Sequence, residues 1–224
     1  MPVSLPNCAR CSFKVTDRVC RVEGGKHPEN CPTANDPGLS EETIDLYREK
    51  ENFEFARQAS IQESEGYSNR ELGYEKLRPA KPRIEEILEF VDRMGYRKIG
   101  MAFCIGLRKE AGMVEKIFSS RGFAIVSAIC KIGRVPKEML GLNDEEKISV
   151  GEFESMCNPI LQAQILNREK TEFNILLGLC VGHDSLFLKY ADALCTVLAV
   201  KDRVTGHNPL AAVYTLDSYY RALK

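Results

Sequence analysis

The stretch KIGMAFCIGLRKEAGMVEKIFSSRGFAIVSAIC, residues 98–130, decides the fold. Its two ends, 98–104 and 123–130, are short and almost continuously apolar, which is typical of strands buried on both faces of a sheet. Between them, residues 107–120 carry apolar side chains at helical spacing, and Gly122 follows as a helix-ending residue. A strand, a helix and a second strand in this order predict a right-handed crossover between parallel strands.

The same alternation continues on both sides of this stretch. Upstream, Pro82 opens an amphipathic helix that Gly95 closes. Downstream, Asn158 and Pro159 combine an N-cap with proline at the first helical position. The other predicted elements are a strand at 173–180, a helix opening at 182–185, a strand at about 196–200 and a C-terminal helix after Asn208 and Pro209. We therefore predict that residues 82–224 form a three-layer, Rossmann-like α/β domain around a mainly parallel sheet of four strands or more.

Four cysteines precede this domain, with the spacing Cys8-x2-Cys11-x8-Cys20-x10-Cys31. A Cys-x-x-Cys turn directs two thiolates at one point, and the other two cysteines follow short loops that let them complete a tetrahedron. This segment has five basic and three acidic residues, an excess that suits the formal charge of −2 on Zn²⁺ with four thiolates. An oxidised [4Fe–4S] cluster with four thiolates has the same charge. The spacing predicts a metal site with these four ligands.

Zinc is slightly preferred over the [4Fe–4S] cluster, because Zn²⁺ needs nothing beyond four thiolates. Cys31 is followed by Pro32, an ending also found in ferredoxin-type cysteine runs, so the [4Fe–4S] cluster is almost as strongly supported as zinc. His27 lies between the cysteines and is interpreted as a loop residue rather than a substitute ligand.

These patterns divide the chain into three parts. Residues 1–38 are predicted to be the four-cysteine module, and residues 39–81 a helical and linker segment with a helix from Glu41 to about Ser60, capped by Ser40. Residues 82–224 are the α/β domain. Residues 131–156 are its least regular part, because glycines and a proline interrupt any long element.

Composition limits the classes of function. The 224 residues carry a formal net charge of −1, so no basic field attracts nucleic acid or an acidic membrane. We expect neither a secretory leader nor a membrane span. Nine cysteines, an odd number partly placed in apolar runs, favour a reducing cytoplasm over a disulfide knot. No glycine-rich dinucleotide fingerprint or Walker loop is present, so nicotinamide and nucleotide chemistry are not favoured.

A second group of cysteines follows the predicted strands. Ligands gather outside the carboxyl ends of parallel strands, so residues at these ends share one rim. Two Gly-His turns fall on the same rim, where a histidine can bind metal or transfer a proton. The candidate residues for a second metal or ligand site are Cys104, Cys130, Cys157, Cys180, His183, Asp184, His207 and Asn208. The competing interpretation is that each cysteine is a small core residue, as we infer for Cys195 at the start of a strand.

Three functions are compatible with these residues, and whether the chain is an enzyme stays open. The first is a cytoplasmic metal-binding protein whose strand-end pocket holds a second metal or a small anionic ligand. The second is a thiol-dependent or iron–sulfur redox enzyme acting on a small molecule, with Cys157 or Cys180 as nucleophile and His183 as base. The third is an interaction module with a structural zinc knuckle, which binds a protein partner or a second copy. None of the three involves nucleic acid or a membrane.

Longer phrases of the sequence resemble a known family. They are the N-terminal cysteine run, ESMCNPILQAQILNREKTEFNILLGLCVGHDSLF at 154–187 and VLAVKDRVTGHNP at 197–209. Together they are similar to a prokaryotic metal-binding protein family of unknown function, domain of unknown function 1847. The resemblance covers nearly the whole chain. It implies an N-terminal metal site at Cys8, Cys11, Cys20 and Cys31, and it implies no established reaction.

Overall fold

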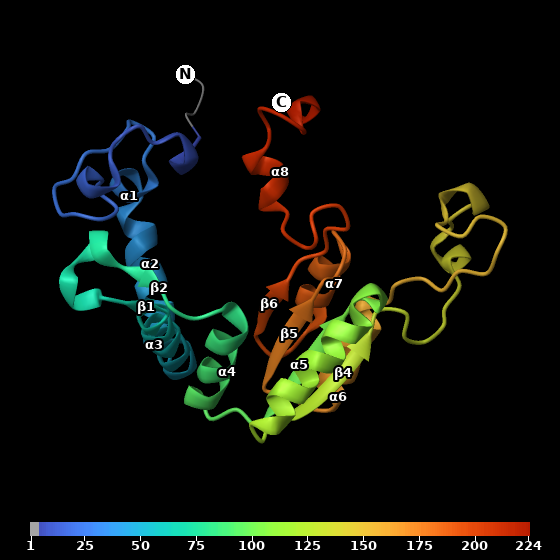
Figure 1. Cartoon of the computed structure of the whole chain (residues 1–224). Coiled ribbons are helices and arrows are strands. Elements are labelled where there is room, and N and C mark those ends of the chain that lie inside the picture. Colours follow the sequence, from blue (N-terminus) through green and yellow to red (C-terminus); the bar gives the residue numbers. More distant parts are fainter. Residues whose placement is uncertain (1–4) are drawn as a thin grey trace. The chain divides into compact units, whose positions relative to one another are not determined.

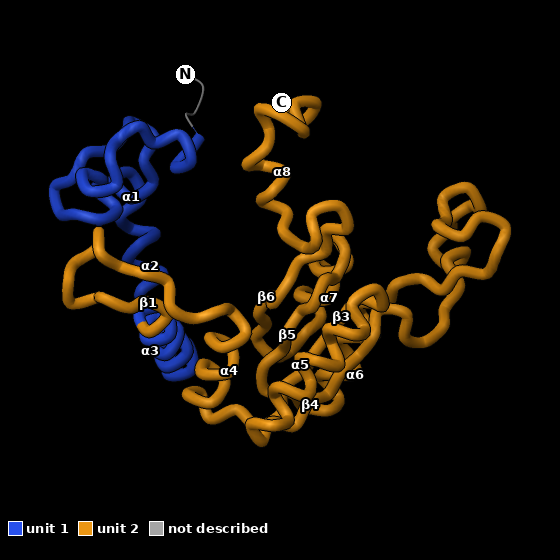
Figure 2. The backbone as a smooth tube through the Cα atoms, in the orientation of Figure 1, with its two compact units in different colours: residues 1–64 blue, residues 65–224 orange. Residues whose placement is uncertain are grey.

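The computed structural model describes residues 5–224, and the chain divides into two compact units, residues 1–64 and 65–224 (Figures 1 and 2). Of the predicted module 1–38, residues 1–4 lie outside the described residues. In residues 5–224, no helix combines the length and the apolar composition that crossing a bilayer requires.

The first unit is helical after its cysteine-rich start. Its helices are α1 (Pro32–Asn35), α2 (Pro37–Arg48) and α3, which runs from Lys50 to Glu65. The single helix predicted from Glu41 to Ser60 is therefore two helices, because Glu49 takes an extended conformation with ψ of 132°. The first of them begins at Pro37 rather than after Ser40, which fits the preference of proline for the first helical turn.

The second unit contains a four-stranded parallel sheet flanked by helices. Its strands are β3 (Lys98–Phe103), β4 (Ala124–Ile129), β5 (Phe173–Leu177) and β6 (Cys195–Ala199). The spatial order is β4-β3-β5-β6, and all three neighbouring pairs are parallel. Its helices are α4 (Arg83–Arg93), α5 (Arg108–Ser120), α6 (Pro159–Arg168), α7 (His183–Tyr190) and α8 (Leu210–Tyr214). The prediction of an α/β domain with a parallel sheet is confirmed.

The core lies around the two central strands. Ile99 and Met101 of β3 and Ile175 of β5 are at most 1% exposed, as the nearly continuous apolar runs predict. Helices α5 and α6 both contact β3 and β4, and α6 also packs against α7. Phe118 of α5 and Leu166 of α6 are completely buried. The two edge strands are less buried, which agrees with their position in the sheet.

Three local features differ from the predicted elements. Strand β5 ends at Leu177 instead of residue 180, because Gly178 has a φ of +67° that an extended strand does not allow. A small antiparallel pair, β1 (Tyr67–Ser68) and β2 (Arg78–Pro79), occupies the predicted linker. Helix α8 begins at Leu210, two residues after Asn208, and has no side-chain cap. Short 3-10 turns lie at 8–10, 15–17, 70–72, 74–76, 105–107, 137–140, 144–146 and 221–223.

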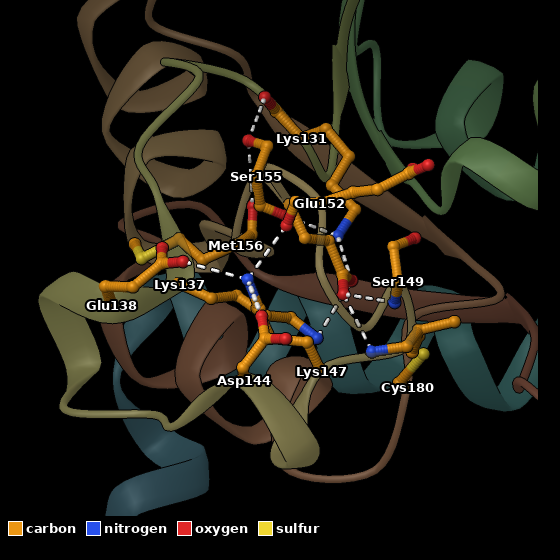
Figure 3. A network of polar contacts seen from close by, with 12 residues as sticks. Lys131, Lys137, Glu138, Asp144, Lys147, Ser149, Glu152, Ser155, Met156 and Cys180 are labelled. Carbon is orange, nitrogen blue, oxygen red and sulfur yellow. Dashed lines mark hydrogen bonds and ion pairs between the residues drawn. The ribbon is translucent and has the colours of Figure 1, made fainter.

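Residues 131–156 form a loop that leaves the sheet after β4 and returns at α6. Its two ends meet, because the Asn158 amide donates to the Cys130 carbonyl at 2.7 Å. At its stem the Met156 amide donates to the Val135 carbonyl at 2.8 Å. Figure 3 shows the polar network that fixes the loop. In it, Glu154 pairs with Lys137 at 2.8 Å, and Lys131 Nζ donates to the Ser155 carbonyl at 2.5 Å. We call residues 131–156 the return loop.

Replacing Glu154 by Gln is expected to loosen the return loop without unfolding the sheet. Lys137, followed by the Ser149 and Ile148 amides, lowers the pKa of Glu154 from its ordinary 4.5 to about 2. A lowered acid pKa means that this stabilisation is present above about pH 4.5 and is lost as the pH falls toward 2. Gln lacks the charge, so the loop should lose part of the roughly 1.5–3 kcal/mol that a hydrogen bond to a charged group contributes.

Hydrogen exchange of the Met156 amide measures this effect. Its protection should fall in Glu154→Gln at neutral pH, and in the unaltered protein it should fall between about pH 4.5 and 2. Glu152→Gln is the matched control, because the Lys147 ammonium contacts the backbone carbonyl of Glu152, which the substitution retains. Equal protection in both variants would contradict a role for the Glu154 charge.

Candidate functional site

The four N-terminal cysteines line a single cavity. Cys8, Cys11, Cys20 and Cys31 all contribute to its wall, although they are spread over 24 residues of sequence. The cavity measures about 50 Å³, and Arg18 and Lys26 line it as well. His27 is not among the lining residues, and its Nδ1 atom lies 3.2 Å from the Pro28 carbonyl oxygen. The structure thus places all four predicted ligands around one space, with two cations beside them.

Local hydrogen bonds shape the first two turns of this wall. The Cys11 amide donates to the Cys8 carbonyl at 3.2 Å and closes the Cys-x-x-Cys turn. The Arg18 guanidinium then ties the following loop, because its Nε donates to the Phe13 carbonyl at 2.8 Å and its Nη2 to the Cys11 carbonyl at 3.1 Å. One arginine therefore fixes the backbone at the predicted ligand Cys11 and two residues after it.

Gly25 allows the second half of the wall to approach the first. The Lys26 amide donates to the Asp17 carbonyl at 2.6 Å, and the Val19 amide donates to the Lys26 carbonyl at 3.1 Å. A Cβ atom at Gly25 would lie 2.5 Å from the backbone of Arg18 and Val19, a separation that only glycine avoids. This close pairing brings the segment that leads to Cys31 against the segment that leads to Cys20.

The cysteine module has almost no hydrophobic core. Of residues 5–36, only Cys31 is buried. Its regular structure consists of two 3-10 turns, one isolated parallel bridge between Arg18 and Lys26, and the four-residue helix α1. As the side chains of residues 5–224 lie, no group of three or more His, Cys, Asp or Glu is arranged to hold a metal ion. A folded segment of this size with so little apolar burial is expected to need a covalent or metal staple.

The second candidate site lies at the carboxyl ends of the parallel strands. The order β4-β3-β5-β6 places the reversal of strand order between β3 and β5, which is where ligands bind in open α/β sheets. Cys104 follows β3 directly and Cys130 follows β4 directly. Cys157 comes two residues before α6, and His183 is the first residue of α7. Four of the predicted residues therefore converge from separate elements.

Their side chains form a row of interacting neighbours. Cys104 and Cys130 belong to one buried cluster, and Cys157 packs against it. The Cys130 thiol influences the pKa of both Cys104 and Cys157, and Cys157 influences in turn the pKa of His183. The Ile105 amide donates to the Cys130 sulfur at 3.3 Å. Cys104 and Cys130 are buried, whereas Cys157 is half-buried and reachable. We call Cys104, Cys130, Cys157 and His183 the thiol row.

The thiol row has an uneven distribution of protons. The Cys130 thiol and then His183 lower the pKa of Cys157 to about 4, with Lys131 adding a favourable charge. The same contact with Cys157 raises the pKa of His183. The pKa of Cys130 is raised by its contacts with Cys104 and Cys157, followed by burial. These opposite shifts favour a thiolate at Cys157 beside a protonated His183, and a protonated thiol at Cys130.

Cys104 has its own cation on the other side of the row. Its contact with Cys130, the Gly106 amide and the Lys201 charge lower the pKa of Cys104. Gly106 leaves the space that Lys201 enters, since a Cβ there would lie 3.0 Å from Lys201 Nζ and 3.9 Å from Cys104 Sγ. Lys201 and Lys131 are absent from the residues predicted for this site. The available signal was their position in the sequence. Lys201 follows β6 with only Val200 between them, and Lys131 comes directly after Cys130.

The other predicted residues have different contacts. The Arg203 Nη2 donates to the Cys180 sulfur at 3.2 Å, and Asp184 Oδ1 accepts from the Ser185 amide. His207 accepts from the Asp202 amide at 3.2 Å through Nδ1, which closes a loop after β6. The Asn208 carbonyl accepts from the Ala211 amide. Cys195, interpreted from the sequence as a core residue, is half-buried, and its thiol donates a hydrogen bond to the Ala193 carbonyl.

Two comparisons place the chain among known sequences. A family model described as "Protein of unknown function (DUF1847)" matches residues 31–198, a range that includes the thiol row and Cys31 and begins after the first three cysteines. The uncharacterized protein MJ0455 of Methanocaldococcus jannaschii is 42% identical over 215 residues, which cover 95% of each chain. Neither description names an activity. The chain therefore belongs to the DUF1847 family of proteins of unknown function.

Proposed function

We propose that the chain is a metal-binding protein whose N-terminal module holds zinc or a [4Fe–4S] cluster through Cys8, Cys11, Cys20 and Cys31. The observation that carries this proposal is the cavity that all four thiols line. The donor set fits both groups, because each takes four thiolates. Arg18 and Lys26 offset the negative charge of the ligated state. Four thiolates on one metal would leave no open coordination position, which would give the site a structural role.

Anaerobic purification with metal analysis and a visible spectrum tests this proposal. One zinc per chain in a colourless protein identifies zinc, and about four irons per chain in a brown protein identifies the cluster. Replacing the four cysteines by serine should abolish the bound metal in either case. Unchanged metal content in that variant would overturn the proposal, and any metal that stays in it belongs to a second site.

We further propose that the second unit is a three-layer, Rossmann-like domain with thiol-dependent chemistry at its strand ends. Helices α5 and α6 contact the same two strands, which supports a layered arrangement. The thiol row supports a nucleophilic Cys157 with His183 as its charge partner, as in other activated cysteines. This observation favours a reactive thiol at the strand ends over a second metal. The second metal site stays a prediction. Nine free cysteines support the cytoplasm as the working compartment.

The rate of alkylation of Cys157 should stay high at mildly acidic pH. An ordinary thiol has a pKa of 9.0 and is almost wholly protonated at pH 6, whereas the pKa of Cys157 is lowered to about 4. Iodoacetamide labelling between pH 5 and 8, followed by peptide mapping, measures the rate at each cysteine. Cys195, whose pKa is raised by burial, is the internal reference. His183→Asn should raise the pKa of Cys157 and move its labelling toward higher pH.

A further inference from the structure

Two thiols of the row stand at the two ends of one loop. Cys130 precedes the return loop and Cys157 follows it, and the hydrogen bond from the Asn158 amide to the Cys130 carbonyl holds these ends together at 2.7 Å. The Cys157 side chain packs against the buried cluster that contains Cys130. A disulfide has an S–S length of about 2.05 Å and needs neighbouring Cα atoms, and the joined loop ends keep the two backbones close.

The two thiols differ in access and in proton state. Cys157 is half-buried, whereas Cys130 is only 3% exposed, so a reagent from solvent meets Cys157 first. Cys130 and then His183 lower the pKa of Cys157, whereas the pKa of Cys130 is raised by its two cysteine neighbours. The buried row restricts the reagent to a small one. A half-buried thiol with a lowered pKa beside a buried thiol is the arrangement that a two-step oxidation requires.

We propose that Cys157 and Cys130 are a redox-active dithiol that reduces small hydroperoxides. This inference deepens the thiol chemistry proposed for the strand ends and is independent of the N-terminal metal site. In the first step the Cys157 thiolate attacks the terminal oxygen of the hydroperoxide and the O–O bond breaks. The alcohol, or water in the case of hydrogen peroxide, leaves with a proton from the His183 imidazolium, and Cys157 becomes a sulfenic acid.

In the second step the Cys130 sulfur attacks the sulfenic sulfur. The S–O bond breaks, and the departing hydroxide takes the Cys130 proton and leaves as water. Two thiols have then lost two electrons and two protons to one hydroperoxide, and an S–S bond joins Cys130 to Cys157. A small thiol reductant returns the pair to the starting state through thiol–disulfide exchange. Cys104 contacts Cys130 from the other side and does not take part in these steps.

Equimolar hydrogen peroxide added to the reduced, full-length protein tests the proposal. The expected result is the loss of two free thiols and a peptide pair linked through Cys130 and Cys157. In Cys130→Ser, the sulfenic acid at Cys157 should persist and be trapped by dimedone. Cys157→Ser should lose both the disulfide and the trapped product, and His183→Asn should react more slowly. Cys195→Ser is the matched control and should form the linked pair normally.

The readouts separate this inference from the broader proposal. Fast alkylation of Cys157 without a disulfide overturns the hydroperoxide inference and keeps the reactive thiol. Slow alkylation of Cys157 overturns both. A peptide pair linked through Cys104 and Cys130 would mean that Cys104, and not Cys157, forms the disulfide with Cys130, and it also overturns the inference. Near-ultraviolet and far-ultraviolet circular dichroism of each variant shows whether it is folded. If a variant is unfolded, the linked Cys130–Cys157 peptide pair in the unaltered protein decides: its absence overturns the inference.

Discussion

Adding a chelator to the purified protein is expected to remove the metal proposed for the N-terminal module, to unfold residues 5–36 and to leave the parallel sheet intact. The cysteine module buries only Cys31 and has no strand pairing beyond the contacts around Lys26. Structural zinc sites contribute about 10–16 kcal/mol of apparent binding free energy at neutral pH, which in such modules is the folding free energy. The second unit keeps its own hydrophobic core and needs no such contribution.

Hydrogen exchange detected by mass spectrometry follows both units in one experiment. The Val19 and Lys26 amides, which are hydrogen-bonded in the module, should lose their protection on chelation, while amides of β3 and β5 keep theirs. Cys11→Ser should reproduce the effect of the chelator without any chelator present. Cys195→Ser leaves the module unchanged and serves as the control. Full protection of Val19 and Lys26 after complete metal removal would show that the module folds without a staple.

Gly100→Ala should destabilise the second unit by about 2–3 kcal/mol, the usual cost of inserting atoms into a packed core. Gly100 lies in the middle of β3, where a Cβ atom would approach Asn174 Oδ1 to 2.0 Å and Leu166 Cδ1 to 2.8 Å. Neither neighbour yields easily, because both are completely buried and Asn174 Oδ1 accepts a hydrogen bond from Thr171 at 2.8 Å. The substitution therefore moves the sheet against α6.

Gly112→Ala is the matched control for this measurement. Gly112 lies within α5, and a Cβ there would have no heavy atom within 4 Å. The same chemical change should stabilise the protein by about 0.5–1 kcal/mol, since alanine favours a helix over glycine. Urea unfolding curves of both variants give the two free energies. Similar values of the same sign would contradict the packing around Gly100 described here.

The sheet was predictable because its strands are buried on both faces. The apolar runs at 98–104 and 123–130 have no polar alternation, and each matches an observed strand within one residue. The end of β5 was not predictable from hydrophobicity, because Leu179 continues the apolar run and is itself buried. Only the backbone of Gly178, with its positive φ, ends the strand there. The β1–β2 pair was missed because it consists of two exposed residues in each strand.

The thiol row was partly predictable for the same reason. Parallel strands present their carboxyl ends at one edge, so Cys104 and Cys130 could be placed on that edge from the sequence. That they follow neighbouring strands depends on the pairing of β3 with β4, which the sequence pattern leaves open. The position of Cys180 depended on the end of β5, and the turn at Gly178 gives it Arg203 as a partner instead. Lys201 was visible as a residue after the last strand, but its proximity to Cys104 depends on the absence of a side chain at Gly106.

The closed base of the return loop makes its outer part an insertion point. The chain leaves and re-enters the domain at one place, since the Cys130 carbonyl and the Asn158 amide are bonded to each other. The entropy of closing a loop rises only with the logarithm of its length, by about 0.6 kcal/mol for each doubling. A reporter peptide or a small domain inserted near Gly141, where the backbone turns with a φ of +76°, would therefore extend from the protein while both thiols stay in register.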